Sequence, residues 1–271
     1  MSLTSVISDP KVKKKLLAEF PNIPNLKIAK KILAPSISAH PQLVGVSFDY
    51  ILRFYIKRLN ASAYEQKWVA EASVELDLLP KRYRRKGLKI LTDAKIEHLR
   101  YMYSGKFNSL LFRSIFRLAQ LDAVYRSGEV DGRLGFVDKK AIKDLRRLTN
   151  LLRPKVFKSK KHCELNPTFG SASNMVGGAD ADLIIDTTLI DIKVTKELKF
   201  TRQHFNQLIG YYVLSEIERS DDPFAFDRKI KNLGIYFARY GLLHSFSVAS
   251  VINRTKLLKV KKILRGYRSS G

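Results

Sequence analysis

The sequence predicts an α/β protein in which a mixed central sheet is flanked by helices and preceded by a mostly helical N-terminal region. Two observations lead to this prediction. Apolar residues recur at helical spacing through much of residues 1–150, whereas short β-branched or aromatic segments separated by turn residues follow Pro154. We therefore divide the chain into a helical region, residues 1–150, and an α/β core with a basic C-terminal helix, residues 151–271.

The N-terminal region is expected to contain one long regular helix and several shorter ones. Prolines at positions 10, 21, 24, 35 and 41 interrupt its beginning, which predicts short helices and loops there. From Leu43 to Leu59 apolar residues recur at helical spacing and predict a helix. Helical patterns continue over residues 61–79, 92–103 and 107–127, and the basic segment 80–89 is expected to break them.

The core is expected to run strand, strand, helix, strand. The strands are predicted at residues 183–185, 189–194 and 233–240, and a helix at 201–217, capped by Thr201. The short turn at 186–188 predicts an antiparallel hairpin, while the helix provides the crossover that makes the last strand parallel to its predecessor. The sheet should therefore be mixed. A basic helix is predicted at 254–268.

The charge of the chain indicates a polyanionic partner. The 271 residues include 50 Lys and Arg against 25 Asp and Glu, a net charge of +25, and 45% are hydrophobic. That hydrophobic content excludes a disordered polycation, so the charge belongs to a folded body and favours nucleic acid as the partner. The side chains expected to contact nucleic acid are Lys81, Arg82, Arg84, Arg85, Lys158, Lys160, Lys161 and Gln203.

The single cysteine, Cys163, excludes an internal disulfide framework, a four-cysteine zinc site and a cysteine-ligated iron–sulfur cluster. It fits a reducing, cytoplasmic location. No apolar run reaches the roughly 18 residues of a membrane span, so we expect no membrane partner.

Three charged residues of the predicted hairpin are expected to converge. Side chains alternate along a strand, so Asp191 and Lys193 point the same way, and Asp182 can face them from the neighbouring strand. Two close carboxylates repel unless a divalent cation lies between them, and oxygen ligands suit Mg²⁺ or Mn²⁺. A lysine beside that cation can hold an attacking water and stabilise phosphoryl charge.

The helix after the hairpin carries a polar stripe at four-residue steps, formed by Gln203, Gln207 and Tyr211. Uncharged amide and phenol groups suit a half-buried wall that donates hydrogen bonds to a phosphate or a base edge. Gly210 lies in the same helix and is expected to allow close packing of the helix on the sheet.

These residues resemble the PD-(D/E)XK nuclease superfamily. The resemblance rests on Asp182, on Asp191-Ile192-Lys193 and on the Gln-x-x-x-Tyr motif of the RecB-like branch, Gln207 to Tyr211, and it spans roughly residues 160–240. It implies a restriction-endonuclease-like sheet, with Asp182 and Asp191 binding the metal. Lys193 would assist the nucleophilic water, and Gln207 and Tyr211 would support the site and contact the substrate backbone.

Two features of the motif leave alternatives open. Ala181 occupies the place of the family's proline, and Asp180 shares strand parity with Asp182, so it competes as a ligand; we favour Asp182 because it adjoins the apolar strand. The RecB-like branch also has an upstream Gly-x-x-x-His helix.

Gly45 to Asp49 resembles that upstream helix, with aspartate in place of the histidine. Asp49 is thus a third metal ligand, or the partner of Arg53 in an ordinary helical ion pair. Asp122 and Glu164 are the other acids that could complete the site.

The sequence therefore predicts a Mg²⁺- or Mn²⁺-dependent nuclease that hydrolyses phosphodiester bonds of DNA, as a monomer or a homodimer. The alternative is a nuclease-fold protein that binds nucleic acid, as a scaffold or accessory subunit, without cutting it. Both hypotheses share the basic surface, and metal binding separates them.

Overall fold

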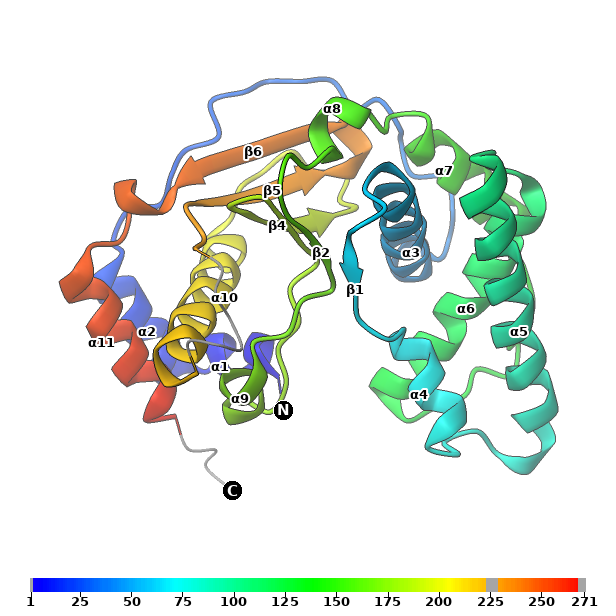
Figure 1. The fold of residues 1–271 in the computed structure, drawn as a ribbon, viewed down its shortest axis with the longest axis horizontal. Helices are drawn as coiled ribbons and strands as arrows, with labels where there is room; N and C mark the ends of the chain where they lie inside the picture. Colours follow the sequence, from blue (N-terminus) through cyan, green and yellow to red (C-terminus); the bar gives the residue numbers. More distant parts are fainter. Residues whose placement is uncertain (1, 223–228, 268–271) are drawn as a thin grey trace.

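The computed structural model describes residues 2–222 and 229–267, which form an α/β fold around a mixed sheet (Figure 1). The helices before the sheet core are α1 (Leu3–Ser8), α2 (Pro10–Glu19), α3 (Pro41–Leu59), α4 (Val69–Glu75), α5 (Lys81–Ser104), α6 (Ser109–Ser127), α7 (Lys139–Thr149) and α8 (Pro154–Phe157). Those within and after it are α9 (Gly170–Met175), α10 (Arg202–Asp221) and α11 (Arg254–Arg265), with the 3-10 turns η1 (Ala238–Tyr240) and η2 (Val248–Ser250).

Six strands of the described residues lie in the sheet in chain order. They are β1 (Tyr64–Glu65), β2 (Cys163–Leu165), β3 (Leu183–Ile185), β4 (Thr188–Lys193), β5 (Asn232–Phe237) and β6 (Leu242–Ser247). The pairs β1–β2 and β4–β5 are parallel, and the other neighbours are antiparallel. The predicted antiparallel hairpin, the crossover through α10 and the mixed character of the sheet are confirmed.

Alternate residues of the strands point into two separate hydrophobic cores. In β4, Ile190 belongs to the core shared with α3, α5, α6 and α7, whereas Leu189 belongs to the core shared with α10. Figure 1 shows α10 on one side of the sheet, together with α1, α2, α9 and α11, and α3 to α7 on the other side. Asp191 and Lys193, two and four residues after Leu189, therefore face α10 as well.

The first two helices pack with the sheet core, although they lie within the predicted helical region 1–150. Leu3, Val6 and Leu16 are buried in the same core as α10. At Gly210 an added Cβ would lie 3.0 Å from the Leu3 side chain. The expected close approach at Gly210 therefore exists, but it is to α1 and not to the sheet.

Several local predictions were wrong. Residues 61–79 do not form one helix, because β1 pairs with β2 before α4 begins. The basic segment 80–89 does not break the helical pattern, because Pro80 precedes the first residue of α5, where a proline costs no hydrogen bond. β2 and β6 were not predicted, and the predicted last strand ends at Phe237. α11 ends at Arg265, and position 268 lies outside the described residues.

Candidate active site

A cavity of about 250 Å³ lies where β3, β4, α10 and α1 meet. The polar side chains that line it come from four elements and two loops. They are Ser2, Thr4, Arg126, Asp180, Asp182, Asp191, Lys193, Gln207 and Tyr211. The cavity thus brings together the five residues for which the sequence predicted a catalytic role.

The register of the β3–β4 hairpin sets Asp182 opposite Asp191. Leu183 pairs with Ile190, so the next antiparallel step places the two aspartates across from each other, with both side chains on the α10 side of the sheet. Lys193 follows two residues after Asp191 and shares its face. Asp191 is buried, whereas Lys193 is partly open to solvent.

Lys193 is held between a carboxylate and an amide. Its Nζ lies 2.8 Å from Oδ2 and 3.2 Å from Oδ1 of Asp191, and it donates to Oε1 of Gln207 at 3.0 Å. The Nε2 of Gln207 in turn donates to the Tyr211 hydroxyl at 3.1 Å. Burial opposes the charge of Lys193, but the nearby carboxylates of Asp191 and Asp182 outweigh it and raise its pKa, so the ammonium stays protonated.

Asp182 is the carboxylate most strongly destabilised in its charged form. Burial, followed by the charges of Asp191 and Asp49, raises its pKa well above the ordinary value of 3.8. The attraction of Lys193 and a hydrogen bond from the Ile192 N–H to Oδ2, at 2.5 Å, oppose this shift. A cation at this position would relieve the repulsion.

The three candidate upstream acids have different surroundings. Asp122 uses both carboxylate oxygens, since Oδ2 accepts from the Tyr50 hydroxyl at 2.9 Å and Oδ1 from Arg126 at 2.6 Å. Glu164 lies within β2 opposite Ile184 and does not line the cavity.

Asp49 forms the predicted ion pair with Arg53 at 2.8 Å and is likewise absent from the cavity lining. Its Oδ1 is buried, and no residue of the described chain donates a hydrogen bond to it. Burial raises the pKa of Asp49, against the attraction of Arg53. Because its charge also raises the pKa of Asp182, Asp49 is electrostatically part of the site.

Sequence patterns predicted no site role for α1 or for Arg126. Ser2, Leu3 and Thr4 form one wall of the cavity, and Arg126 reaches it from the end of α6 while held by Asp122. Asp180 also lines the cavity, so the competition with Asp182 remains. Nothing in the local sequence pattern marks the N-terminal residues, because only tertiary packing brings them to the hairpin.

The side chains predicted to contact nucleic acid lie apart from this cavity. Lys81, Arg82, Arg84 and Arg85 occupy the first turns of α5, which lies on the far side of the helical region from the sheet in Figure 1. Lys158 donates to the Leu59 carbonyl at 2.5 Å. Lys160 and Lys161 line a different cavity, and Gln203 lines a third one beside α1.

Within the described part of the chain, no three His, Cys, Asp or Glu side chains form a group that could hold a metal ion. A cation here would be bound by the two opposed carboxylates and take its remaining ligands from water and substrate.

None of the helices in residues 2–222 and 229–267 is long and apolar enough to cross a membrane. No protein-family model matches the chain, and searches of curated proteins and of solved structures gave no match.

Proposed function

We propose that the protein is a Mg²⁺- or Mn²⁺-dependent nuclease of the PD-(D/E)XK type that hydrolyses phosphodiester bonds of DNA. The observation that supports this most is the position of Lys193, whose ammonium lies between Asp191 and Gln207 in a cavity that Asp182 also lines. The net charge of +25 supports a nucleic acid as the substrate. The finer fold assignment, a restriction-endonuclease-like sheet, belongs to the same proposal.

The two opposed carboxylates suit a divalent cation. Asp182 and Asp191 offer hard oxygen ligands, and the raised pKa of Asp182 reflects first its burial and then the charges of Asp191 and Asp49, a repulsion that a cation would relieve. The buried Oδ1 of Asp49, which no described residue satisfies, is a further oxygen whose charge acts on the same group. When bound, Mg²⁺ would supply a water of lowered pKa and neutralise charge on the phosphate.

The chain's own side chains would orient the substrate around that centre. The Lys193 ammonium can donate to the attacking water or to a phosphoryl oxygen on which charge develops. Gln207 fixes the lysine because its Oε1 accepts a hydrogen bond from the ammonium. Because Gln207 donates to the Tyr211 oxygen, the phenolic proton of Tyr211 is left to donate to the substrate backbone.

The test compares purified wild-type protein with the Lys193→Ala and Asp191→Ala variants on linear, circular and single-stranded DNA with Mg²⁺ or Mn²⁺. Lys139→Ala, which changes an exposed lysine of α7, is the matched control. Loss of a preorganised donor to the transition state predicts about a hundred- to a thousand-fold slower cleavage by Lys193→Ala. Equal cleavage by all four proteins would refute the proposal.

A non-cutting nucleic-acid binder is the second candidate. It is favoured by one observation: protein groups already engage the carboxylates, since Lys193 pairs with Asp191 and the Ile192 N–H with Asp182. Calorimetric titration with Mn²⁺ separates the candidates. Binding that is lost in Asp182→Asn and Asp191→Asn supports the nuclease, and no binding to the wild type supports the binder.

A further inference from the structure

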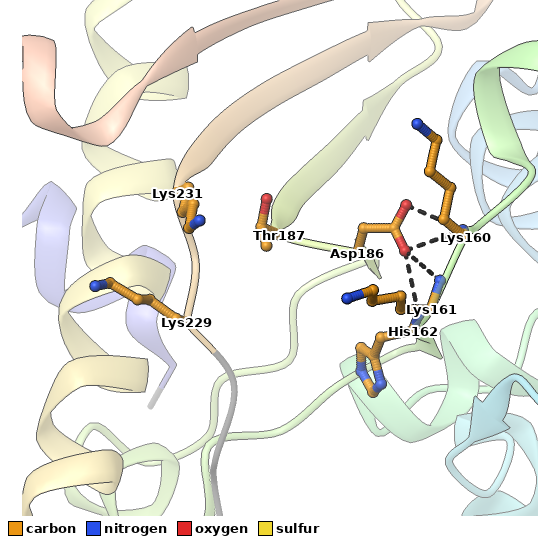
Figure 2. A pocket seen from close by; sticks show the side chains of 7 residues that line it. All are labelled: Lys160, Lys161, His162, Asp186, Thr187, Lys229 and Lys231. Carbon is orange, nitrogen blue, oxygen red and sulfur yellow. Dashed lines mark hydrogen bonds between the residues drawn. The ribbon is translucent and has the colours of Figure 1, made fainter.

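A second, larger cavity lies at the turn end of the β3–β4 hairpin and is lined mainly by lysines (Figure 2). Its volume is about 730 Å³. Four lysines, Lys160, Lys161, Lys229 and Lys231, line it together with one acidic residue, Asp186, and we call it the lysine pocket. Figure 2 shows the Lys161 side chain pointing into the space between the two segments, whereas the Lys160 and Lys229 side chains extend away from it. The sequence predicted that Lys160 and Lys161 contact nucleic acid, but it did not predict that they lie near Lys229 and Lys231.

The hairpin turn holds the first pair of lysines in place. Asp186 adopts a left-handed backbone conformation, with φ of 52°, and its carboxylate accepts the backbone N–H groups of Lys160 at 3.0 Å and Lys161 at 2.8 Å. Figure 2 shows these bonds and the Lys161 side chain extending toward the space between the two lysine-bearing segments. The backbone of this segment is therefore fixed while its side chains stay exposed.

The neighbouring turn residue holds Lys231 of the second segment. The Thr187 carbonyl accepts the N–H groups of Lys231 at 2.8 Å and Asn232 at 3.1 Å. Two adjacent residues of one turn thus position lysines from segments that are about 70 positions apart in the sequence.

Among the described residues, the lining of the pocket carries four lysines and one carboxylate, that of Asp186. Burial would raise the pKa of Asp186, but its backbone hydrogen bonds outweigh burial and lower it, so the carboxylate is ionised and already occupied. In the chain as described, none of the four ammonium groups forms an ion pair with a carboxylate. An excess of positive charge around one concave surface favours an anionic ligand.

The lysine pocket is separate from the candidate active site. Asp186 and Thr187 precede Thr188, the first residue of β4, whereas Asp191 is its fourth residue and Lys193 its last. At about 3.3 Å per residue, Asp191 is roughly 10 Å and Lys193 roughly 16 Å from Thr188 along the strand. A ligand in the pocket would therefore contact the protein at a second point, away from the carboxylates.

We propose that the lysine pocket binds phosphate groups of a nucleic-acid backbone, as an anchoring site distinct from the carboxylate cavity. The inference rests on the proposed function only in taking nucleic acid as the partner. Lysine acts as a point charge on phosphate without reading base sequence, so the anchoring is independent of sequence.

The test uses the full chain and a fluorescein-labelled duplex DNA in EDTA, so that cleavage plays no part. Fluorescence anisotropy over a salt series compares wild type with Lys161→Gln/Lys231→Gln, one lysine from each segment. The control is Lys139→Gln/Lys140→Gln, a pair equally exposed on α7. In the pocket variant, the slope of log K against log salt is expected to fall by about 0.9 for each phosphate that the protein no longer neutralises, and by less in the control.

Acetylation of lysines in the free and bound protein gives a second readout. Lys161 and Lys231 should be protected by bound DNA, and Lys139 and Lys140 should not. An equal change of slope in both variants, or no protection of the pocket lysines, overturns the inference. So does a pocket variant that loses binding to vesicles of anionic lipid while it keeps the wild-type slope on DNA.

The outcomes also separate this inference from the proposed function. A wild type that binds DNA through the pocket but never cuts it rejects only the nuclease. A wild type that cuts DNA but shows the same slope in both variants rejects only the anchoring site.

Discussion

The guanidinium of Arg239 binds the carboxylate of Asp144 through two hydrogen bonds, at 2.7 and 3.1 Å, and both side chains are buried. Arg239 lies in η1, directly after β5, and Asp144 in α7. The same guanidinium donates to the Ala34 carbonyl at 2.9 Å. This pair therefore ties the sheet core to the helical region and to the segment that connects α2 with α3.

Removing one partner of this ion pair should destabilise the fold. Arg239→Met leaves a buried carboxylate without its counter-ion, which costs about 3–5 kcal/mol of unfolding free energy. The double variant Arg239→Met/Asp144→Leu should recover much of that loss because no charge is left unpaired. Urea denaturation of the three proteins measures both effects, and a double variant less stable than the single one would contradict the explanation.

Asp182→Asn should make the protein more stable at neutral pH while abolishing cleavage. The folded state raises the pKa of Asp182 above 3.8, so the folded protein holds this proton more tightly, and ionisation costs stability as the pH rises. The stability gain of the variant should disappear below 3.8, where the group is protonated in both states. Thermal unfolding at several pH values measures this.

Asp186→Asn is the matched control and should behave in the opposite way. Backbone hydrogen bonds lower the pKa of Asp186 below 3.8, so its charge contributes stability at neutral pH that is lost as the pH falls through the folded pKa. The variant should be less stable than wild type at neutral pH and approach it in acid. If both variants change stability in the same direction, the net charge of the protein, and not the surroundings of each aspartate, determines the change.

Arg126→Gln should weaken DNA binding at the candidate active site. Arg126 lines the cavity and is held by Asp122, so its guanidinium is placed to contact a phosphate. Removing one charge that neutralises a phosphate lowers the magnitude of the salt slope by about 1. Arg133→Gln, an exposed arginine beyond the end of α6, should leave the slope closer to that of wild type. Equal slopes for the two variants would exclude this role.

Asp49→Asn should weaken Mn²⁺ binding at least tenfold, as loss of a group next to a metal site does. Asp49 has a buried carboxylate oxygen that no described residue satisfies, whereas both oxygens of Asp122 are occupied. Isothermal titration should therefore show a larger loss of Mn²⁺ affinity in Asp49→Asn than in Asp122→Asn. Circular dichroism checks that both variants fold, because each substitution removes the counter-ion of an arginine, Arg53 or Arg126. The reverse order of affinities would exclude Asp49 as the upstream acid.

The sequence predicted the parts of the fold that local patterns encode. The hairpin of β3 and β4, strand β5 and helix α10 have the periodicities of buried elements, and Thr201 caps α10 as expected. β1 and β6 form the two edges of the sheet, where a strand needs little apolar pattern. The partner of β1 is also far away in the chain, since Tyr64 pairs with Glu164.

The same division holds for the candidate site. Strand alternation was enough to place Asp191 beside Lys193, and the hairpin register placed Asp182 across from them. The roles of Ser2, Thr4 and Arg126 could not be predicted, because α1 and α6 reach the cavity through tertiary packing alone. Local sequence pattern thus predicted the positions of Asp182, Asp191 and Lys193, whereas the other residues that line the cavity were found only in the structure.

The close approach of Leu3 to Gly210 has a consequence for how the candidate active site forms. Two segments from distant parts of the chain must dock before the wall of the cavity exists, and such long-range loop closure is slow. During refolding, the sheet and its lysine-bearing turn can assemble from closer segments first. The lysine pocket would then form before the candidate active site, with the docking of α1 as the late step.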